Sequence, residues 1–108
     1  METDAILTRL GYAPNDALKE QYDRIVANTH GMDKIQKHIL DLHDVLKVDD
    51  SYVAMSNSND YFKIKIEASS PERTEEAKEK IDHFAKKYKV VLKKVDDKET
   101  YYIAGFAK

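Results

Sequence analysis

The chain has 108 residues, no cysteine and a formal net charge of −2 at pH 7. This length suits one domain with its own core, and the lack of cysteine excludes disulfides, thiolate metal sites and cysteine nucleophiles. The acidic start lacks the positive charge of a secretion signal, and no apolar run approaches membrane-spanning length. We therefore expect a single soluble domain over residues 1–108 that works in the cytoplasm and has no membrane partner.

The charge is distributed unevenly along the chain. Residues 1–60 hold 6 Lys/Arg against 11 Asp/Glu, whereas residues 61–108 hold 12 against 9. A basic half can favour nucleic acid or an acidic partner. Halves of opposite net charge can equally attract each other within the fold or across a dimer. Most charged residues on a small domain simply lie on the solvated surface.

The first part of the chain, residues 1–47, has helical patterns. An apolar cluster near the start allows a short helical segment. Pro14 with Asn15 or Asp16 then offers the start of a longer helix, which closes near residues 28–31, where a glycine supplies a stop.

The strongest helix pattern covers residues 32–47. Leu40 and Val45 fall outside its apolar stripe, so we expect this helix to be contacted from more than one side and to lie between the preceding helix and the sheet. The stripe itself repeats at helical spacing through Ile35, Ile39, Leu42 and Leu46.

After residue 50 the pattern changes from helix to strand. Residues 51–56 and 61–68 both alternate, and the polar residues 57–60 between them favour a turn, which predicts a hairpin. The alternation in 61–68 is strict, so one face of this strand is core and the other meets water. This pattern is typical of an antiparallel or mixed sheet with one uncovered side. The residues predicted on its core face are Phe62, Ile64, Ile66 and Ala68.

A further helix and a second hairpin complete the chain. Ser70 can accept a hydrogen bond from a free backbone N–H, and Pro71 suits the first helical position, so a helix is predicted to begin here. Residues 89–95 and 99–107 then predict two more strands around a polar turn.

These elements predict an α+β domain with two layers. Helices would cover one face of a four-stranded, mostly antiparallel sheet, and an N-terminal helical hairpin would extend it. The order is helix, helix, strand, strand, helix, strand, strand, with a helical segment in 1–47 and a ββαββ segment in 51–107. A right-handed crossover would join strand 61–68 to strand 89–95 if these two are parallel neighbours.

Neither metal-binding nor catalytic motifs stand out. His38 and His43 are five residues apart, and a helix turns them about 140° away from each other, so they cannot share one ion. The best acid–base pairing is His38 with Asp41, while His83 is expected to be exposed. The serines suit turns and caps, and the three glycines are too far apart for a phosphate-binding loop. We expect no metal, no cofactor and no enzymatic activity.

A cluster of lysines follows the third predicted helix and could contact phosphates. Cations in the last turn of a helix also stabilise its negative end, which accounts for Lys86 and Lys87. Lysines on an edge strand discourage unwanted strand pairing, which accounts for Lys93 and Lys94. The candidate basic patch consists of Lys86, Lys87, Lys89, Lys93 and Lys94.

The uncovered face of the sheet is the other candidate surface. Tyr61, Lys63 and Lys65 lie on the polar side of their strand, and one of Tyr101 and Tyr102 must share that face if both hairpins are regular. Tyrosine and lysine on a sheet can stack with and neutralise single-stranded nucleic acid. Aromatic residues on an open sheet can equally pack against a protein partner or a second copy.

Two functions fit these patterns. The first is a non-enzymatic protein that acts through protein association, as a homodimer, because the half-covered sheet and the helical hairpin offer more surface than one small core needs. The second is binding of single-stranded RNA through the open sheet face and the basic cluster from Lys86 to Lys94. The sequence names neither a ligand nor a partner.

Overall fold

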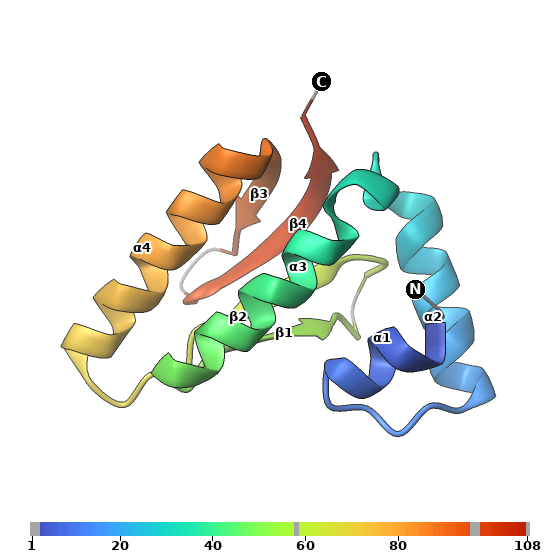
Figure 1. Ribbon diagram of the computed structural model, residues 1–108, viewed down its shortest axis with the longest axis horizontal. Coiled ribbons are helices and arrows are strands. Elements are labelled where there is room, and N and C mark those ends of the chain that lie inside the picture. Colours follow the sequence, from blue (N-terminus) through green and yellow to red (C-terminus); the bar gives the residue numbers. More distant parts are fainter. Residues whose placement is uncertain (1–2, 58, 96–97, 108) are drawn as a thin grey trace.

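The computed structural model of the chain describes residues 3–57, 59–95 and 98–107. Its elements, in chain order, are α1 (Thr3–Arg9), α2 (Asp16–Asn28), α3 (Met32–Leu46), the 3-10 turn η1 (Lys47–Asp49), β1 (Tyr52–Met55), β2 (Phe62–Lys65), α4 (Pro71–Tyr88), β3 (Val90–Lys94) and β4 (Thr100–Phe106). Figure 1 shows α3 and α4 lying over one face of a four-stranded antiparallel sheet. This two-layer arrangement confirms the predicted α+β fold. The short helical segment near the start of the sequence is a regular helix, α1.

Local sequence explains where two of the helices begin. The side chain of Asn15 accepts a hydrogen bond of 2.8 Å from the N–H of Leu18 and caps α2. Ser70 likewise accepts from the N–H of Arg73 at 3.2 Å and caps α4, whose first residue is Pro71. Such caps stabilise a helix by about 1 kcal/mol because they satisfy an N–H group that has no partner within the helix. Both predicted starts are confirmed.

The core lies between the sheet and the two helices above it. On the strands, Val53, Ile64 and Ile103 are fully buried, as their alternation with polar residues requires. Burial of such a side chain contributes about 1.5–3 kcal/mol. The helices supply the other half of the core, including Ile35, Ile39 and Leu46 from α3 and Ala77, Ile81 and Phe84 from α4.

The strand order is β1-β2-β4-β3, and each neighbouring pair is antiparallel. It follows that β2 and β3 run parallel but are not neighbours, so the condition for a crossover between adjacent strands 61–68 and 89–95 is not met. The last strand lies between them because it pairs with β2 on one side and with β3 on the other. The α4 crossover therefore spans two strand positions.

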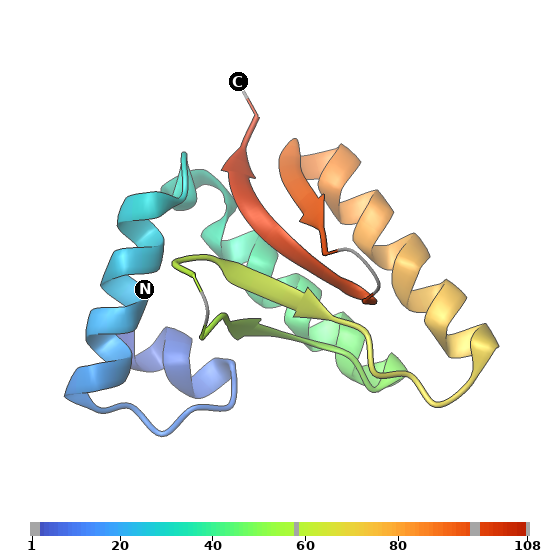
Figure 2. The ribbon, with the colours of Figure 1, turned by 180° about the vertical axis from the view of Figure 1, so that it is seen from behind.

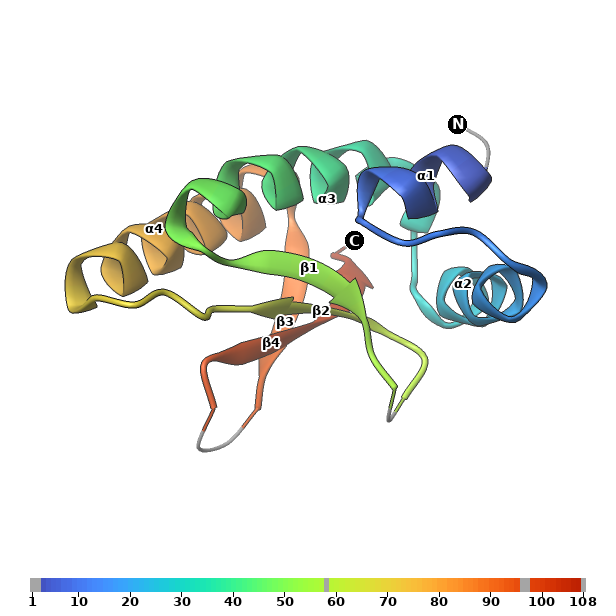
Figure 3. The ribbon, with the colours of Figure 1, turned by 90° about the horizontal axis from the view of Figure 1, so that it is seen from below.

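The predicted place of α3 between α2 and the sheet is also wrong. Viewed from below in Figure 3, α3 lies beside α4, while α1 and α2 pack at one end of the sheet. Asn28 of α2 donates to the carbonyl of Asp60 in the β1–β2 turn at 3.0 Å. The apolar residues outside the α3 stripe have separate explanations: Leu40 is buried near Ile6 of α1, and Val45 remains 45% exposed.

The connection between α2 and α3 joins the sheet at the far end of β4. The N–H of Phe106 donates to the carbonyl of His30 at 2.7 Å, beside an isolated bridge between His30 and Gly105. Two glycines permit this approach. A Cβ on Gly31 would lie 2.7 Å from the Cβ of Phe106, and a Cβ on Gly105 would lie 2.8 Å from the carbonyl oxygen of His30. Both glycines also have positive φ angles, +66° and +147°.

Candidate functional site: the open face of the sheet

The register of the sheet places polar and aromatic side chains on the face opposite the helices. Lys63 of β2 lies opposite Ala54 of β1 and Tyr102 of β4, and Tyr102 in turn lies opposite Lys93 of β3. Cross-strand partners point to the same face, so these four side chains form one row across the sheet. Figure 2 shows the molecule from this side, where no helix covers β2 and β4.

The two tyrosines at the start of β4 face in opposite directions. Tyr102 pairs with Lys63 and is on the open face, whereas Tyr101 pairs with Ile64 and packs against the core. Tyr101 is therefore removed from the candidate interaction face, and Tyr102 is the tyrosine that shares this face with Tyr61. The rings of Tyr61 and Tyr102 lie 6.1 Å apart between centroids with an angle of 40°, so they form one aromatic surface.

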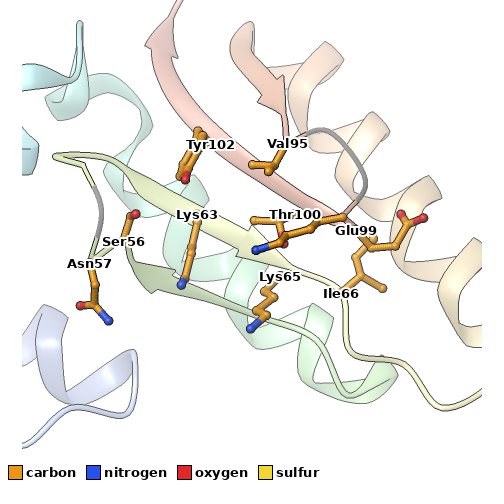
Figure 4. Close-up of a pocket in the computed structure, with 10 residues that line it drawn as sticks. Ser56, Asn57, Lys63, Lys65, Ile66, Val95, Glu99, Thr100 and Tyr102 are labelled. Carbon is orange, nitrogen blue, oxygen red and sulfur yellow. The ribbon is translucent and has the colours of Figure 1, made fainter.

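The open face is concave because both hairpins bend away from the helices, as Figure 3 shows. The concavity has a volume of about 640 Å³. Figure 4 shows Lys63 and Lys65 projecting side by side from β2, with Tyr102 beyond Lys63. The β1–β2 turn, the β3–β4 turn and the strands between them all contribute residues to its lining, namely Ser56, Asn57, Lys63, Lys65, Ile66, Val95, Lys98, Glu99, Thr100 and Tyr102.

Three lysines and one carboxylate line this concavity: Lys63, Lys65 and Lys98 carry positive charge, while Glu99 pairs with Lys78 at 3.4 Å. Lys65 forms a salt bridge of 3.3 Å with Glu67, and Glu67 also accepts a hydrogen bond of 3.2 Å from the Tyr52 hydroxyl. Burial and the neighbouring Glu67 carboxylate raise the pKa of Tyr52, so this hydroxyl stays protonated at neutral pH. Within the described part of the chain, no carboxylate forms a salt bridge with Lys63 or Lys98. The site is thus suited to an anionic ligand.

Tyr52 and Lys98 are among the residues of this face that the sequence-based candidates lack. Tyr52 pairs with Lys65 across β1 and β2 and so lies on the open face, and Lys98 reaches the same concavity from the β3–β4 turn. The alternation of Tyr52 with buried Val53 indicates the correct face for Tyr52. The position of Lys98 depends on the curvature of the hairpin, for which the sequence has no comparable signal.

The predicted lysine cluster does not form one continuous surface. Lys86 and Lys87 lie in the last turn of α4 on the helical side, where Lys86 pairs with Asp82 at 2.9 Å. Lys89 ends the helix in a left-handed conformation with a φ angle of 56°. Only Lys93 belongs to the row on the open face, and Lys94 pairs with the inward-facing Tyr101 at the sheet margin.

The histidines do not assemble into a metal centre. Among the described residues no group of three or more His, Cys, Asp or Glu could hold a metal ion. His38 stacks on Tyr88 with the rings 3.6 Å apart, and His83 is exposed as predicted. His43 is buried, which its sequence pattern does not indicate, and its Nδ1 accepts a hydrogen bond of 3.0 Å from the N–H of Val53.

No helix in the described ranges combines the length and apolar character that a membrane span requires. Comparison with known proteins provides no functional assignment, since no protein-family model matches the chain and neither a curated protein nor a solved structure shows significant similarity to it.

Proposed function

We propose that this protein binds single-stranded nucleic acid on the open face of its sheet. One observation carries the proposal: the Tyr61–Tyr102 ring pair borders a concavity whose other lining residues include Lys63, Lys65 and Lys98. Aromatic side chains can stack with unpaired bases, and lysines can neutralise the phosphates that connect those bases. The surface requires no base-specific hydrogen bonds for this purpose, so sequence-tolerant binding is expected.

The arrangement favours a single strand over a duplex. Stacking on an aromatic side chain contributes about 1–3 kcal/mol per base, and it requires bases that are not already stacked in a helix. Tyr52 lies near the other end of this face, and Lys63 and Lys65 lie between it and the Tyr61–Tyr102 pair. Bases could therefore contact aromatic rings at both ends while the lysines contact the intervening phosphates.

Self-association through this same face is less favourable on electrostatic grounds. A two-fold related copy would bring lysines of both subunits into one interface, and this chain offers few carboxylates there to compensate for them. Like charges in a desolvated interface cost several kcal/mol. The homodimer expected from the sequence stays a prediction. The cytoplasm remains the compartment in which we expect the chain to act, in keeping with its lack of cysteine.

The proposal is tested by fluorescence anisotropy with a labelled oligouridine. Binding should be strong at low salt and should weaken steeply as salt is added, because phosphate contacts release bound counterions. Lys63→Ala should reduce the slope of log affinity against log salt by about 0.7, the value expected for one lost phosphate contact on a single strand. Tyr61→Leu combined with Tyr102→Leu should weaken binding by at least about tenfold through the loss of stacking.

The matched control is Lys86→Ala, which removes an exposed lysine from the helical side. It should leave both the affinity and the salt slope unchanged. Absence of oligouridine binding at low salt would disprove the proposed function, and so would an equal loss of affinity in Lys63→Ala and Lys86→Ala. Parallel measurements with oligothymidine and a hairpin duplex identify which nucleic acid is preferred.

A further inference from the structure

The two edge strands of the sheet, β1 and β3, differ in whether their outward-facing backbone groups are hydrogen-bonded. In an antiparallel ladder, alternate residues direct their backbone N–H and C=O groups to opposite sides of the strand. The N–H of Ser56 donates to the carbonyl of Tyr61, the residue before β2, so by alternation the amides of Val53 and Met55 point away from β2, toward the outer edge of β1.

Side chains from the helical part of the chain satisfy those outward-facing groups of β1. The N–H of Val53 donates to Nδ1 of His43 at 3.0 Å, and the N–H of Met55 donates to the hydroxyl of Tyr12 at 2.9 Å. Just beyond the end of β1, the side-chain amide of Gln21 donates to the carbonyl of Ser56 at 2.9 Å. Both outward-facing amides of this described strand are therefore occupied, and the β1 edge is closed to an additional strand.

The opposite edge, formed by β3, has no such cover. The N–H of Val95 donates to the carbonyl of Thr100 on β4, so by alternation the backbone groups of Leu92 and Lys94 point outward. Within the described ranges, no hydrogen bond reaches either of these amides, and β3 is the terminal strand of the sheet. An edge strand whose N–H and C=O groups lack partners is a template for pairing with another chain.

The side chains along this edge specify the chemistry of the partner. Val91 is 43% exposed and Leu92 is half-buried, while Lys93 and Lys94 are both exposed. In β3 no acidic residue accompanies these two lysines. Pairing with a second copy would therefore gather four lysines in one small interface, whereas acidic residues opposite Lys93 and Lys94 would form favourable cross-strand pairs.

We infer that the β3 edge binds an extended acidic segment of another protein by strand addition. The segment pairs antiparallel to β3 and has two acidic residues followed by two apolar residues, so that the acids face Lys94 and Lys93 and the apolar pair faces Leu92 and Val91. Figures 1 and 3 show the N-terminal part of α4 extending past β3, and α4 packs against this strand. An added strand would lie beside β3 and next to that helix.

This surface is separate from the proposed nucleic-acid site except at Lys93, which borders both. The two sites are therefore testable independently. Lys94→Pro removes an outward-facing N–H without breaking a bond to β4, a substitution that edge strands accept. Lys94→Glu provides a second variant, which retains the backbone donor but repels an acidic segment.

The experiment is selection of peptides from a random octapeptide library on the full chain, followed by affinity measurement and NMR of the selected peptides. We expect enrichment of two acids followed by two apolar residues, with binding weakened by roughly tenfold or more in Lys94→Pro and in Lys94→Glu. The amides of Leu92 and Lys94 should become protected from hydrogen exchange on binding. Lys37→Ala, an exposed lysine of α3, is the control and should bind as the wild type does.

Three results would overturn the inference. One is a failure of the selection to identify the β3 edge, because the library yields no acidic–apolar pattern or its peptides bind the wild type and both Lys94 variants equally. Another is a bound peptide that leaves the amides of Leu92 and Lys94 unprotected and protects only residues outside β3. The third is a concentration-dependent dimer in sedimentation that Lys94→Pro abolishes, since that would assign the edge to a second copy of this chain.

Discussion

Ile64 and Lys63 are neighbours in one strand, yet they belong to opposite faces of the sheet with opposite roles. Ile64 is fully buried beneath the helices, while Lys63 lines the concavity on the other side. The inner face determines whether the chain folds, because burial of apolar surface is the main stabilising contribution. The outer face contributes little apolar burial, and it carries the residues for which we propose a ligand-binding role. Comparison of the two faces predicts that substitutions can alter stability and the proposed binding separately in this protein.

The largest effect is expected on the inner face. Ile64→Ala should lower the free energy of unfolding by about 2–5 kcal/mol, because the lost methyl groups leave a cavity that the surrounding core fills only partly. Urea denaturation followed by circular dichroism measures this change. A loss below about 1 kcal/mol would mean that the two faces do not differ in stability as the burial of Ile64 indicates.

A smaller loss is expected where β4 meets the α2–α3 connection. Gly105→Ala should lower the free energy of unfolding by about 1–3 kcal/mol, since its φ of +147° disfavours a side chain and a Cβ would contact the backbone of His30. Gly11→Ala is the control, because Gly11 also has a positive φ but a Cβ added there would meet no atom within 4 Å. Equal losses in the two variants would show that backbone strain alone acts at Gly105.

A pH-dependent effect is expected at the β1 edge. Burial lowers the pKa of His43 from its usual 6.5, and Lys47 lowers it further, so the folded state favours the neutral ring whose Nδ1 accepts from Val53. The unfolded chain binds the proton more readily. This contribution to stability is therefore complete above pH 6.5 and decreases as the pH falls from there toward the lower pKa of the folded state.

The measurement is urea denaturation of the wild type and of His43→Asn at neutral and at mildly acidic pH. The Asn oxygen can take the place of Nδ1 as an acceptor but does not titrate. The wild type should lose more stability than the variant on acidification, by up to the cost of an unsatisfied buried amide, about 1–3 kcal/mol. Parallel pH profiles in both proteins would argue against this role of His43.

The smallest effect on stability is expected on the open face. Lys63→Ala should change the free energy of unfolding by no more than about 0.5 kcal/mol, as is usual for surface substitutions, although it is the neighbour of Ile64. The same urea titration used for Ile64→Ala tests this. A loss of more than about 1 kcal/mol would mean that Lys63 contributes to the fold, which would weaken its assignment to a ligand site.

Much of the fold could be predicted because local patterns determine it. The alternation around Phe62 and Ile64 assigned the two faces, and the Ser70–Pro71 pair located the start of α4. The position of β4 between β2 and β3 could not be predicted in this way, because strand order depends on long-range pairing that leaves no periodic signal in the chain.

The candidate site was predictable to a similar extent. Tyr61, Lys63 and Lys65 followed from alternation in a single strand, whereas the choice of Tyr102 over Tyr101 required the register between β2 and β4. Proximity along the chain grouped Lys86 and Lys87 with Lys93, but the helix-to-strand change at Lys89 directs them to different sides of the molecule. The burial of His43 depends on contacts with β1, which a single helix pattern cannot indicate.

The central position of β4 has a consequence for folding during synthesis on the ribosome. Until residues 100–106 have left the exit tunnel, β2 lacks one neighbour and β3 lacks its only one. The α2–α3 connection at His30 must wait for the same segment, because its partner is Gly105. Nascent chains that lack this segment would therefore expose unpaired edges of β2 and β3, and the arrival of β4 would complete the sheet in one step.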